Sequence, residues 1–186
     1  MNQKSIKMKS IMSLAVFCGS RSGSFEKFSD DAAALGKILA EKSITLIYGG
    51  GNKGLMAAVA NACMQHGGSV VGVIPKHLTE LEHQHNDLTE LIISEDMHAR
   101  KKMLYEKADA ALVMAGGFGT LDEMFEILTW NHIRLHNKKI FLLNTLGFYD
   151  HLIQHIHKME EVGFLYGSVD DLLTVINSPE EIFQYL

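Results

Sequence analysis

The sequence predicts an α/β protein with a doubly wound parallel sheet of about seven strands and helices on both faces. Short apolar runs alternate along the chain with segments whose apolar residues recur near every 3.6 positions, the pattern of strands followed by amphipathic helices. The apolar runs are continuous, so both faces of the sheet are expected to be buried. Three strand-to-helix junctions are rich in glycine or serine. Ligands bind at such junctions in open parallel sheets, so a functional site is expected there.

Seven apolar runs are the expected strands, and the first of them reads SLAVFCG. The third, SVVGVI, is followed by Pro75, which is expected to stop it because proline cannot donate a hydrogen bond to a neighbouring strand. The strands are expected at residues 13–19, 44–48, 69–74, 88–94, 109–114, 139–144 and 172–176.

Helices are expected between these strands. Pro179 opens a terminal helix, since proline suits the first helical turn. The stretch 76–87 is polar and histidine-rich and is expected to be irregular. The remaining helices are expected at residues 25–42, 54–66, 96–107, 120–134 and 148–161.

Length and composition favour one cytoplasmic domain. The chain of 186 residues suits a single domain, expected at 13–186 after a flexible N-terminal tail at 1–12. A formal charge of −5 without a long basic run disfavours a nucleic acid as the main partner. No apolar stretch approaches the ~18 residues of a membrane span. Cys18 and Cys63 lie far apart in apolar contexts, which indicates a reducing compartment.

The glycine- and serine-rich junctions predict a phosphate or nucleotide site. They read CGSRSGS at 18–24, YGGGNKG at 48–54 and AGGFGT at 115–120. Glycine lets the backbone approach an anion closely, and a helix N-terminus offers free N–H groups and the positive end of the helix dipole. Tight turns with a packing role are the alternative, and for any one loop alone they are the better interpretation.

Other nucleotide-binding and cofactor motifs are disfavoured. Gly49, Gly51 and Gly54 have dinucleotide-motif spacing, but they follow the second strand and lack the acid expected about 20 residues later. Neither a P-loop nor a nucleophile elbow occurs. Histidine pairs such as His132 and His136 are joined by no cysteine, and no lysine is marked out as a Schiff base for pyridoxal phosphate. We therefore expect neither a metal nor a cofactor.

Two separated motifs carry a resemblance to a known family. GGFGTLDE at 116–123 is preceded by MHARK at 97–101, with YGGGNKGLM upstream. At this spacing, residues 13–165 resemble the LOG (LONELY GUY) family of cytokinin riboside 5′-monophosphate phosphoribohydrolases, often mislabelled lysine decarboxylases. Ala115 stands where the family usually has proline, and Ala57 where it usually has glycine. The sheet is accordingly expected to be Rossmann-like.

The resemblance implies hydrolysis of the N-glycosidic bond of a purine nucleoside 5′-monophosphate, either AMP or an N6-substituted AMP, to free base and ribose 5-phosphate. It assigns catalysis to Arg100 and Glu123. Substrate contacts are expected from Glu82, Arg100, Lys101, Gly116, Gly117, Phe118, Gly119, Thr120, Leu121, Asp122 and Thr129. A non-catalytic nucleotide or pterin-cofactor carrier on the same fold is the alternative function.

These residue types suit the implied chemistry. The glycine amides and the Thr120 hydroxyl can hold the 5′-phosphate. Glu123 can accept from ribose hydroxyls, stabilise an oxocarbenium-like transition state or activate water. We expect it in the first helical turn, where the helix dipole keeps it ionised. The alternative is that Glu123 only compensates the helix dipole and has no catalytic role. Arg100 holds its proton too firmly for a general acid, so we expect it to orient groups or neutralise charge. A surface charge is its alternative, and His98 is a candidate proton donor to the base.

Two further expectations concern assembly and stability. The segment 120–134 is apolar on more than one face, which predicts a second buried contact, and the resemblance implies a homodimer built around this region. Its apolar residues include Met124, Phe125, Ile127, Leu128, Trp130 and Ile133. Arg100→Ala is expected to abolish activity without unfolding the protein.

Overall fold

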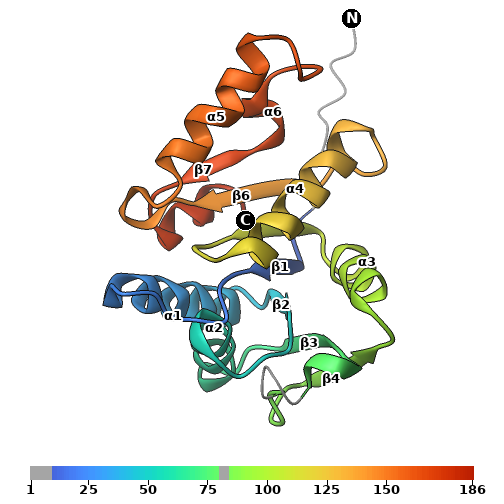
Figure 1. Cartoon of the computed structure of the whole chain (residues 1–186). Helices are drawn as coiled ribbons and strands as arrows, with labels where there is room; N and C mark the ends of the chain where they lie inside the picture. The colour runs from blue at the N-terminus through green and yellow to red at the C-terminus, as the bar shows by residue number, and fades with distance from the viewer. Residues whose placement is uncertain (1–9, 80–83) are drawn as a thin grey trace, which may run out of the picture.

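The computed structural model describes residues 10–79 and 84–186. Within these residues one sheet of seven parallel strands forms the centre of the protein (Figure 1). The bounds are β1 Ser13–Phe17, β2 Thr45–Tyr48, β3 Val70–Pro75, β4 Glu90–Ser94, β5 Ala110–Val113, β6 Lys139–Leu143 and β7 Thr174–Ile176. Each strand overlaps the segment predicted for it, so the predicted fold class is confirmed. Residues 1–9 of the predicted tail lie outside the described residues.

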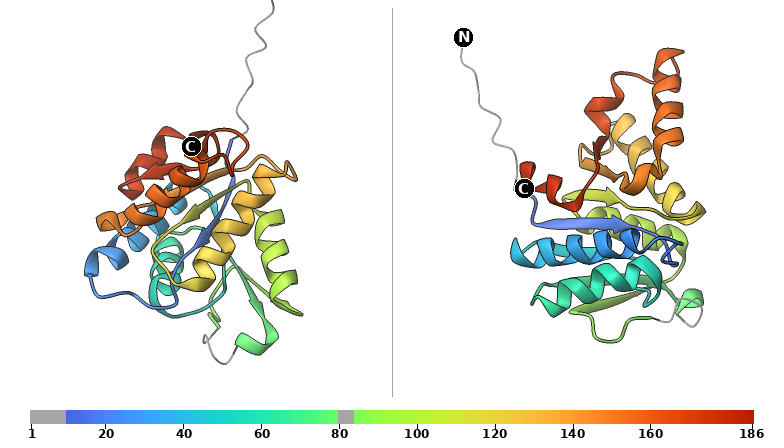
Figure 2. Two further views of the ribbon diagram at one scale, coloured as in Figure 1. Left: turned by 45° about the horizontal axis from the view of Figure 1, so that its top comes forward. Right: turned by 90° about the vertical axis from the view of Figure 1, so that its left-hand side faces the viewer.

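Helices cover both faces of the sheet. Their bounds are α1 Glu26–Glu41, α2 Gly54–Gln65, α3 Met97–Lys107, α4 Phe118–His132, α5 Asp150–Glu161 and α6 Val169–Leu172, with 3₁₀ helices η1 Lys76–Leu78, η2 Thr145–Gly147 and η3 Pro179–Gln184. Helices α1 and α2 lie side by side on one face, where they pack against Leu14 and Leu46 (Figure 2). Helices α3, α4 and α5 pack on the other face, against Ala15 and Ile47. Successive strand residues point to opposite faces, so burial of both faces explains the continuous apolar runs.

The strand order places a crevice next to β1. From one edge to the other the order is β4, β3, β2, β1, β5, β6, β7. The chain thus moves outward from β1 to β4, returns to pair β5 with the other side of β1, and moves outward again. In doubly wound sheets the ligand binds outside the carboxyl ends of the strands where this order reverses. The loops after β1 and β5, both glycine-rich, meet there.

Several helices differ from the sequence expectation, and the 3₁₀ helices η1 and η2 were not predicted. Helix α4 begins at Phe118 rather than at Thr120, because Gly117 takes an extended N-cap conformation with φ −99° and ψ −153°. The helix that opens at Pro179 is a 3₁₀ helix. The short helix α6 was not predicted, and the Ser168 hydroxyl caps it by accepting from the Asp170 N–H at 3.4 Å. In the described residues no helix combines the length and apolarity that a membrane span requires.

Candidate active site

The loops that follow β1, β2 and β5 meet in one cleft of about 230 Å³ at the crevice. The predicted site residues that line it are Arg100, Gly117, Phe118, Gly119, Thr120, Asp122 and Glu123. Cys18 and Ser20 of the first predicted junction, Gly49 of the second and Met97 of the MHARK motif also line the cleft, although none of them was named individually as a site residue. The structure therefore brings the two predicted catalytic residues and most of the glycine loop together.

The N-terminus of α4 opens onto this cleft with N–H groups outside the helical hydrogen-bond pattern. Gly117 is the N-cap residue and has no side chain to accept from the first turn. The Leu121 N–H donates to the Gly117 carbonyl at 3.1 Å, whereas the amides of Phe118, Gly119 and Thr120 precede the first intrahelical bond. Together with the positive end of the helix dipole, these amides offer the kind of donors that can bind an anion.

The glycines of this loop have different surroundings. A Cβ on Gly116 would lie 2.1 Å from Thr120 Oγ1, so Gly116 is required for the loop to pack against its own helix. A Cβ on Gly117 or Gly119 would meet no described protein atom within 4 Å. Glycine at these two positions leaves space that a ligand can occupy.

Two hydrogen bonds hold the entry to the loop. The Gly19 N–H donates to the Ala115 carbonyl at 3.0 Å, and the Tyr149 hydroxyl donates to the Met114 carbonyl at 2.8 Å. Ala115 is itself buried. The loop is therefore anchored at the position where the family usually has proline.

Arg100 reaches the cleft from α3 and is buried, with 6% of its surface exposed. Its Nε donates to the Val73 carbonyl at 3.1 Å, and its Nη2 donates to the Gly49 carbonyl at 3.3 Å. Its Nη1 lies 3.9 Å from Glu123 Oε1. This burial excludes the interpretation of Arg100 as a surface charge, and the two carbonyls fix the plane of the guanidinium.

The glycine loop after β2 has a packing role. A Cβ on Gly49 would lie 2.2 Å from Arg100 Nη2, so this glycine makes room for the guanidinium. Gly54 has φ +56°, and a Cβ there would lie 2.4 Å from the Arg21 backbone nitrogen. The packing alternative therefore holds for Gly54, while Gly49 shapes the site through Arg100.

Glu123 is 9% exposed and lies on the cleft side of α4. The sequence suggested that Glu123 lies in the first turn of this helix. Because α4 begins at Phe118, Glu123 lies in the second turn instead. The influence of a helix dipole falls off within the first turn. The positive charge of Arg100, whose Nη1 lies 3.9 Å from Glu123 Oε1, therefore acts on this carboxylate more strongly than the helix dipole does.

Cys18 lies at the floor of the cleft, where burial, and next the negative charge of Glu123, raise the pKa of its thiol. Burial also raises the pKa of Cys63, to about 11. Both cysteines are free and buried. The thiolate is the reactive form of cysteine, so neither side chain is suited to act as a nucleophile.

We predict that iodoacetamide leaves both thiols of the folded protein unmodified between about pH 7 and 9, because both pKa values lie above their ordinary range. Mass spectrometry of the intact protein measures this directly. The same treatment in denaturant should label Cys18 and Cys63. A Cys18 adduct on the native protein would show that the thiol is ionised or accessible.

Lys101 forms ion pairs with two acids of α4. Its Nζ lies 3.1 Å from Asp122 Oδ2 and 2.9 Å from Glu126 Oε2. Burial acts to lower the pKa of Lys101, but the hydrogen bonds and charges of Glu126 and Asp122 outweigh it and raise the pKa above its ordinary value. Lys101 therefore stays charged, which is unsuitable for a Schiff-base lysine. It does not line the cleft, and together with Thr129 it borders a neighbouring hollow.

The remaining predicted residues are dispersed around the cleft. Gly116 faces a second hollow on the other side of the loop. Leu121 packs against the core, and the Thr129 hydroxyl donates to the Phe125 carbonyl at 2.6 Å. His98 is exposed on α3 and is absent from the cleft lining. Glu82 lies outside the described residues, so its predicted substrate contact stays a prediction.

The histidine pairs do not converge on acids or cysteines where the structure describes them. No group of three His, Cys, Asp or Glu side chains in the described residues is arranged to hold a metal ion. Buried His85 is bound to a neutral partner, with its Nε2 2.8 Å from Asn61 Oδ1. His83, which has ligand-like spacing to His85 in the sequence, lies outside the described residues.

Comparisons with known sequences agree on one family. A family model described as "Possible lysine decarboxylase" matches residues 56–186. A cytokinin riboside 5′-monophosphate phosphoribohydrolase from Rhodococcoides fascians is 43% identical over 154 residues, which cover 82% of this chain and 78% of the relative. An enzyme of the same name from Arabidopsis thaliana is 36% identical over 173 residues, covering 93% of this chain and 81% of the relative.

Comparisons with solved structures concern the fold. The molybdenum cofactor binding protein from Rippkaea orientalis superposes with a TM-score of 0.70 at 20% identity, covering 95% of each chain. The molybdenum cofactor carrier protein from Chlamydomonas reinhardtii gives a TM-score of 0.71 at 18% identity, covering 92% of this chain and 93% of the carrier. At such low identity this likeness establishes the Rossmann-like fold alone.

Proposed function

This chain belongs to the LOG family of cytokinin riboside 5′-monophosphate phosphoribohydrolases, and we propose that it hydrolyses the N-glycosidic bond of a purine nucleoside 5′-monophosphate. AMP or an N6-substituted AMP would give free base and ribose 5-phosphate. One observation carries the proposal: the uncapped N-terminus of α4 and the Arg100–Glu123 pair line the same cleft. An anion site and a buried carboxylate stand at the two ends of one small cavity.

The phosphate binds at the N-terminus of α4. The amides of Phe118, Gly119 and Thr120 precede the first intrahelical bond, and the Thr120 side chain also lines the cleft. Gly117 and Gly119 leave the approach clear. These donors contact only the phosphate, so they bind any nucleoside monophosphate whatever its base. They contribute nothing to the binding of the matching nucleoside, which lacks the phosphate.

The sugar lies next to Glu123. About one helical turn, ~5.4 Å along the axis, separates the first-turn amides from the backbone of Glu123, whose side chain lines the same cleft. A ligand held by its 5′-phosphate therefore brings its ribose towards the acid. There the carboxylate stabilises positive charge on the sugar or activates the attacking water. Arg100 keeps its proton. It acts by neutralising negative charge and by orienting the groups around it. Water adds to C1′, the glycosidic bond breaks, and the base leaves with a proton.

The base lies at the rim of the cleft. A volume of about 230 Å³ is below the ~300–1,000 Å³ usual for a whole ligand site, so it suits the phosphate and the ribose. Phe118 lines this cleft and is 93% exposed. An exposed aromatic ring at the rim can stack on a purine, which supports a nucleotide with a large base.

Base release from nucleotides tests the proposed function. Wild-type protein is incubated with AMP, N6-substituted AMP, GMP, CMP and UMP, and with adenosine, and the free base is measured by chromatography. We expect purine monophosphates to be cleaved and adenosine to be rejected, because phosphate binding contributes to transition-state stabilisation. Tight nucleotide binding without base release would favour the carrier function instead. Equal rates on AMP and adenosine would refute the role of the anion site.

We predict that Gly119→Ala raises the KM for AMP roughly tenfold while the protein becomes slightly more stable. A Cβ at this position meets no described protein atom within 4 Å, and alanine in place of a helical glycine stabilises by about 0.4–1 kcal/mol. The new methyl group instead occupies phosphate space. Steady-state kinetics and thermal melting measure both effects. Unchanged KM together with unchanged inhibition by inorganic phosphate would place the phosphate elsewhere.

A homodimer built on α4 is part of the proposal. Met124 and Ile127 of this helix are buried in the core, whereas Phe125 and Ile133 are 37% and 56% exposed. An apolar hollow of about 120 Å³ lies between α4 and α5, with Phe125 in its lining. Exposed apolar side chains beside an apolar hollow support a contact with a second copy. The two free, buried cysteines support a cytoplasmic protein.

We predict a dimer mass by multi-angle light scattering at micromolar concentration. Phe125→Asp should convert the protein to a monomer, because it places a charge in the apolar contact. Phe183→Asp is the matched control, since Phe183 is 40% exposed on η3, away from this helix. A clean monomer mass for the wild-type protein would refute the dimer.

A further inference from the structure

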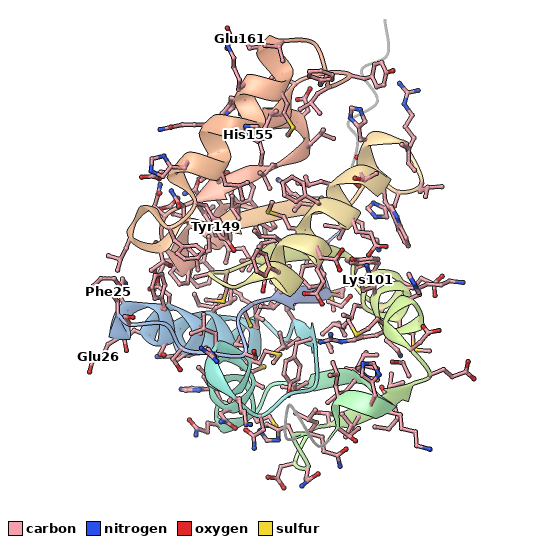
Figure 3. The ribbon with its side chains drawn as sticks, viewed as in Figure 1. Phe25, Glu26, Lys101, Tyr149, His155 and Glu161 are labelled. Carbon is pink, nitrogen blue, oxygen red and sulfur yellow. The ribbon has the colours of Figure 1, made fainter. Side chains whose placement is uncertain are left out.

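Two rows of side chains join α3 to α4 beside the cleft. Lys101 and Tyr105 are four residues apart and lie on one side of α3. Asp122 and Glu126 have the same spacing on α4. Figure 3 shows Lys101 where α3 approaches α4. Tyr105 and Glu126 do not line the cleft, and neither belongs to the motifs that carry the family resemblance.

The spacing between Arg100 and Glu123 depends on how α3 sits against α4. Arg100 belongs to α3 and is bound to the Val73 and Gly49 carbonyls, so its guanidinium is fixed to the sheet. Glu123 belongs to α4, whose position relative to α3 decides how far the carboxylate lies from Arg100. The observed separation of 3.9 Å is sensitive to a small shift of α4.

Tyr105 contacts α4 directly behind Glu123. Its ring is 1% exposed and packs edge-to-face against Phe17 at 5.8 Å and Trp130 at 5.0 Å. Its hydroxyl lies 2.8 Å from Glu126 Oε2 and 3.3 Å from the backbone carbonyl of Glu123. One proton serves both acceptors, and the shorter bond, which involves a charged partner, is the stronger. The hydroxyl thus touches the backbone of the proposed catalytic residue itself.

Glu126 joins the two rows through one oxygen. Oε2 accepts from Tyr105 at 2.8 Å and pairs with Lys101 Nζ at 2.9 Å. Lys101 also pairs with Asp122 at 3.1 Å, one residue before Glu123. Burial is substantial, with 11% of the Lys101 side chain and 25% of the Glu126 side chain exposed. Water therefore screens the Lys101–Glu126 contact less than it screens ordinary surface pairs.

From these contacts we infer that Tyr105 and Glu126 are positioning residues that set the distance between Glu123 and Arg100. The inference rests on the proposed function, because it gives the hydrolysis two further residues that touch no substrate. They act by holding the segment of α4 that carries Glu123 against α3. Neither is expected to affect the phosphate site at the start of α4.

Tyr105→Phe is the most selective test, because it removes one hydroxyl and keeps the packed ring. We expect kcat on AMP to fall about tenfold, since a small misplacement of a catalytic group is costly, while KM stays within about twofold. In a Glu123→Gln background the same change should cause no further loss, because the group that it positions is already gone. Glu126→Gln should show the same split between kcat and KM. Additive losses in the double variant would indicate a structural role and overturn the inference.

Tyr185→Phe is the matched control. Tyr185 packs against Lys139 and Phe141 of β6, and Lys139 begins that strand, at the end of the sheet opposite the cleft. This variant should keep wild-type kcat. Melting temperatures of all variants confirm that they are folded.

Crystal structures of the wild type and Tyr105→Phe provide a readout that needs no turnover. We expect the distance from Arg100 Nη1 to Glu123 Oε1 to differ between them, and an unchanged distance overturns the inference. If the wild-type protein releases no base, the proposed function fails and this comparison alone decides the inference. If the wild type is active and Tyr105→Phe keeps its kcat, the inference fails and the proposed function stands.

Discussion

Glu123→Gln is expected to lower turnover on AMP by ~10²-fold or more, the range associated with losing acid–base help. Glutamine keeps the size and hydrogen-bonding capacity of the side chain and removes its charge. If the carboxylate stabilises charge on the sugar or activates water, the loss appears mainly in the transition state. The KM for AMP should change little, because the amides at the start of α4 are untouched. Steady-state kinetics on AMP and thermal melting of the variant are the two measurements.

The control for this variant is Glu106→Gln. Glu106 lies on the exposed side of α3, where it pairs with Lys102 at 3.8 Å, so the same chemical change occurs away from the cleft. Glu106→Gln should therefore leave turnover on AMP unchanged. Near-wild-type turnover in Glu123→Gln, with only a lowered melting temperature, would assign Glu123 to the structural pairing with Arg100 and leave the proposed mechanism without its central residue.

Arg100→Ala is expected to abolish measurable turnover and also to destabilise the fold. The sequence alone suggested loss of activity without unfolding, but Arg100 is 6% exposed and bound to two backbone carbonyls. Its removal breaks the pair with Glu123 and takes away the donor that the two carbonyls share. Breaking a buried ion pair costs about 3–5 kcal/mol. Since the pair is 3.9 Å long, we expect the lower end, about 3 kcal/mol, or roughly 6–12 °C in melting temperature for a chain of this size.

Arg100→Lys separates the two effects. Lysine keeps a positive charge near Glu123 but cannot donate to the Val73 and Gly49 carbonyls in the planar geometry of a guanidinium. We expect the melting temperature to recover by more than half of the loss seen in Arg100→Ala, while turnover stays well below the wild-type rate. Full recovery of turnover would show that charge alone is needed at this position. An unchanged melting temperature in Arg100→Ala would contradict the burial of the guanidinium.

Local patterns in the sequence determined the fold class and the position of the main site. A strand that is buried on both faces must be apolar at every position, so continuous runs such as SLAVF revealed a parallel sheet. Three glycine- or serine-rich junctions in one sheet together indicated an anion site, and at one of them, GGFGT, the structure has an uncapped helix N-terminus. The catalytic roles of Glu123 and Arg100 were expected only from the resemblance of two motifs to the LOG family, since the residue types alone left a helix-dipole acid and a surface charge as alternatives.

Contacts between distant segments were decided only by the tertiary structure. Gly49 has its role because the Arg100 side chain, from another helix, occupies the space of its missing Cβ. Burial of Arg100 depends on where α3 lies on the sheet, which no local pattern encodes. The sequence analysis did not single out Tyr105, because the partners of its hydroxyl lie on α4 and are brought to it only by packing. Residue type and spacing specify what a side chain can do, and packing between distant elements decides which partner it meets.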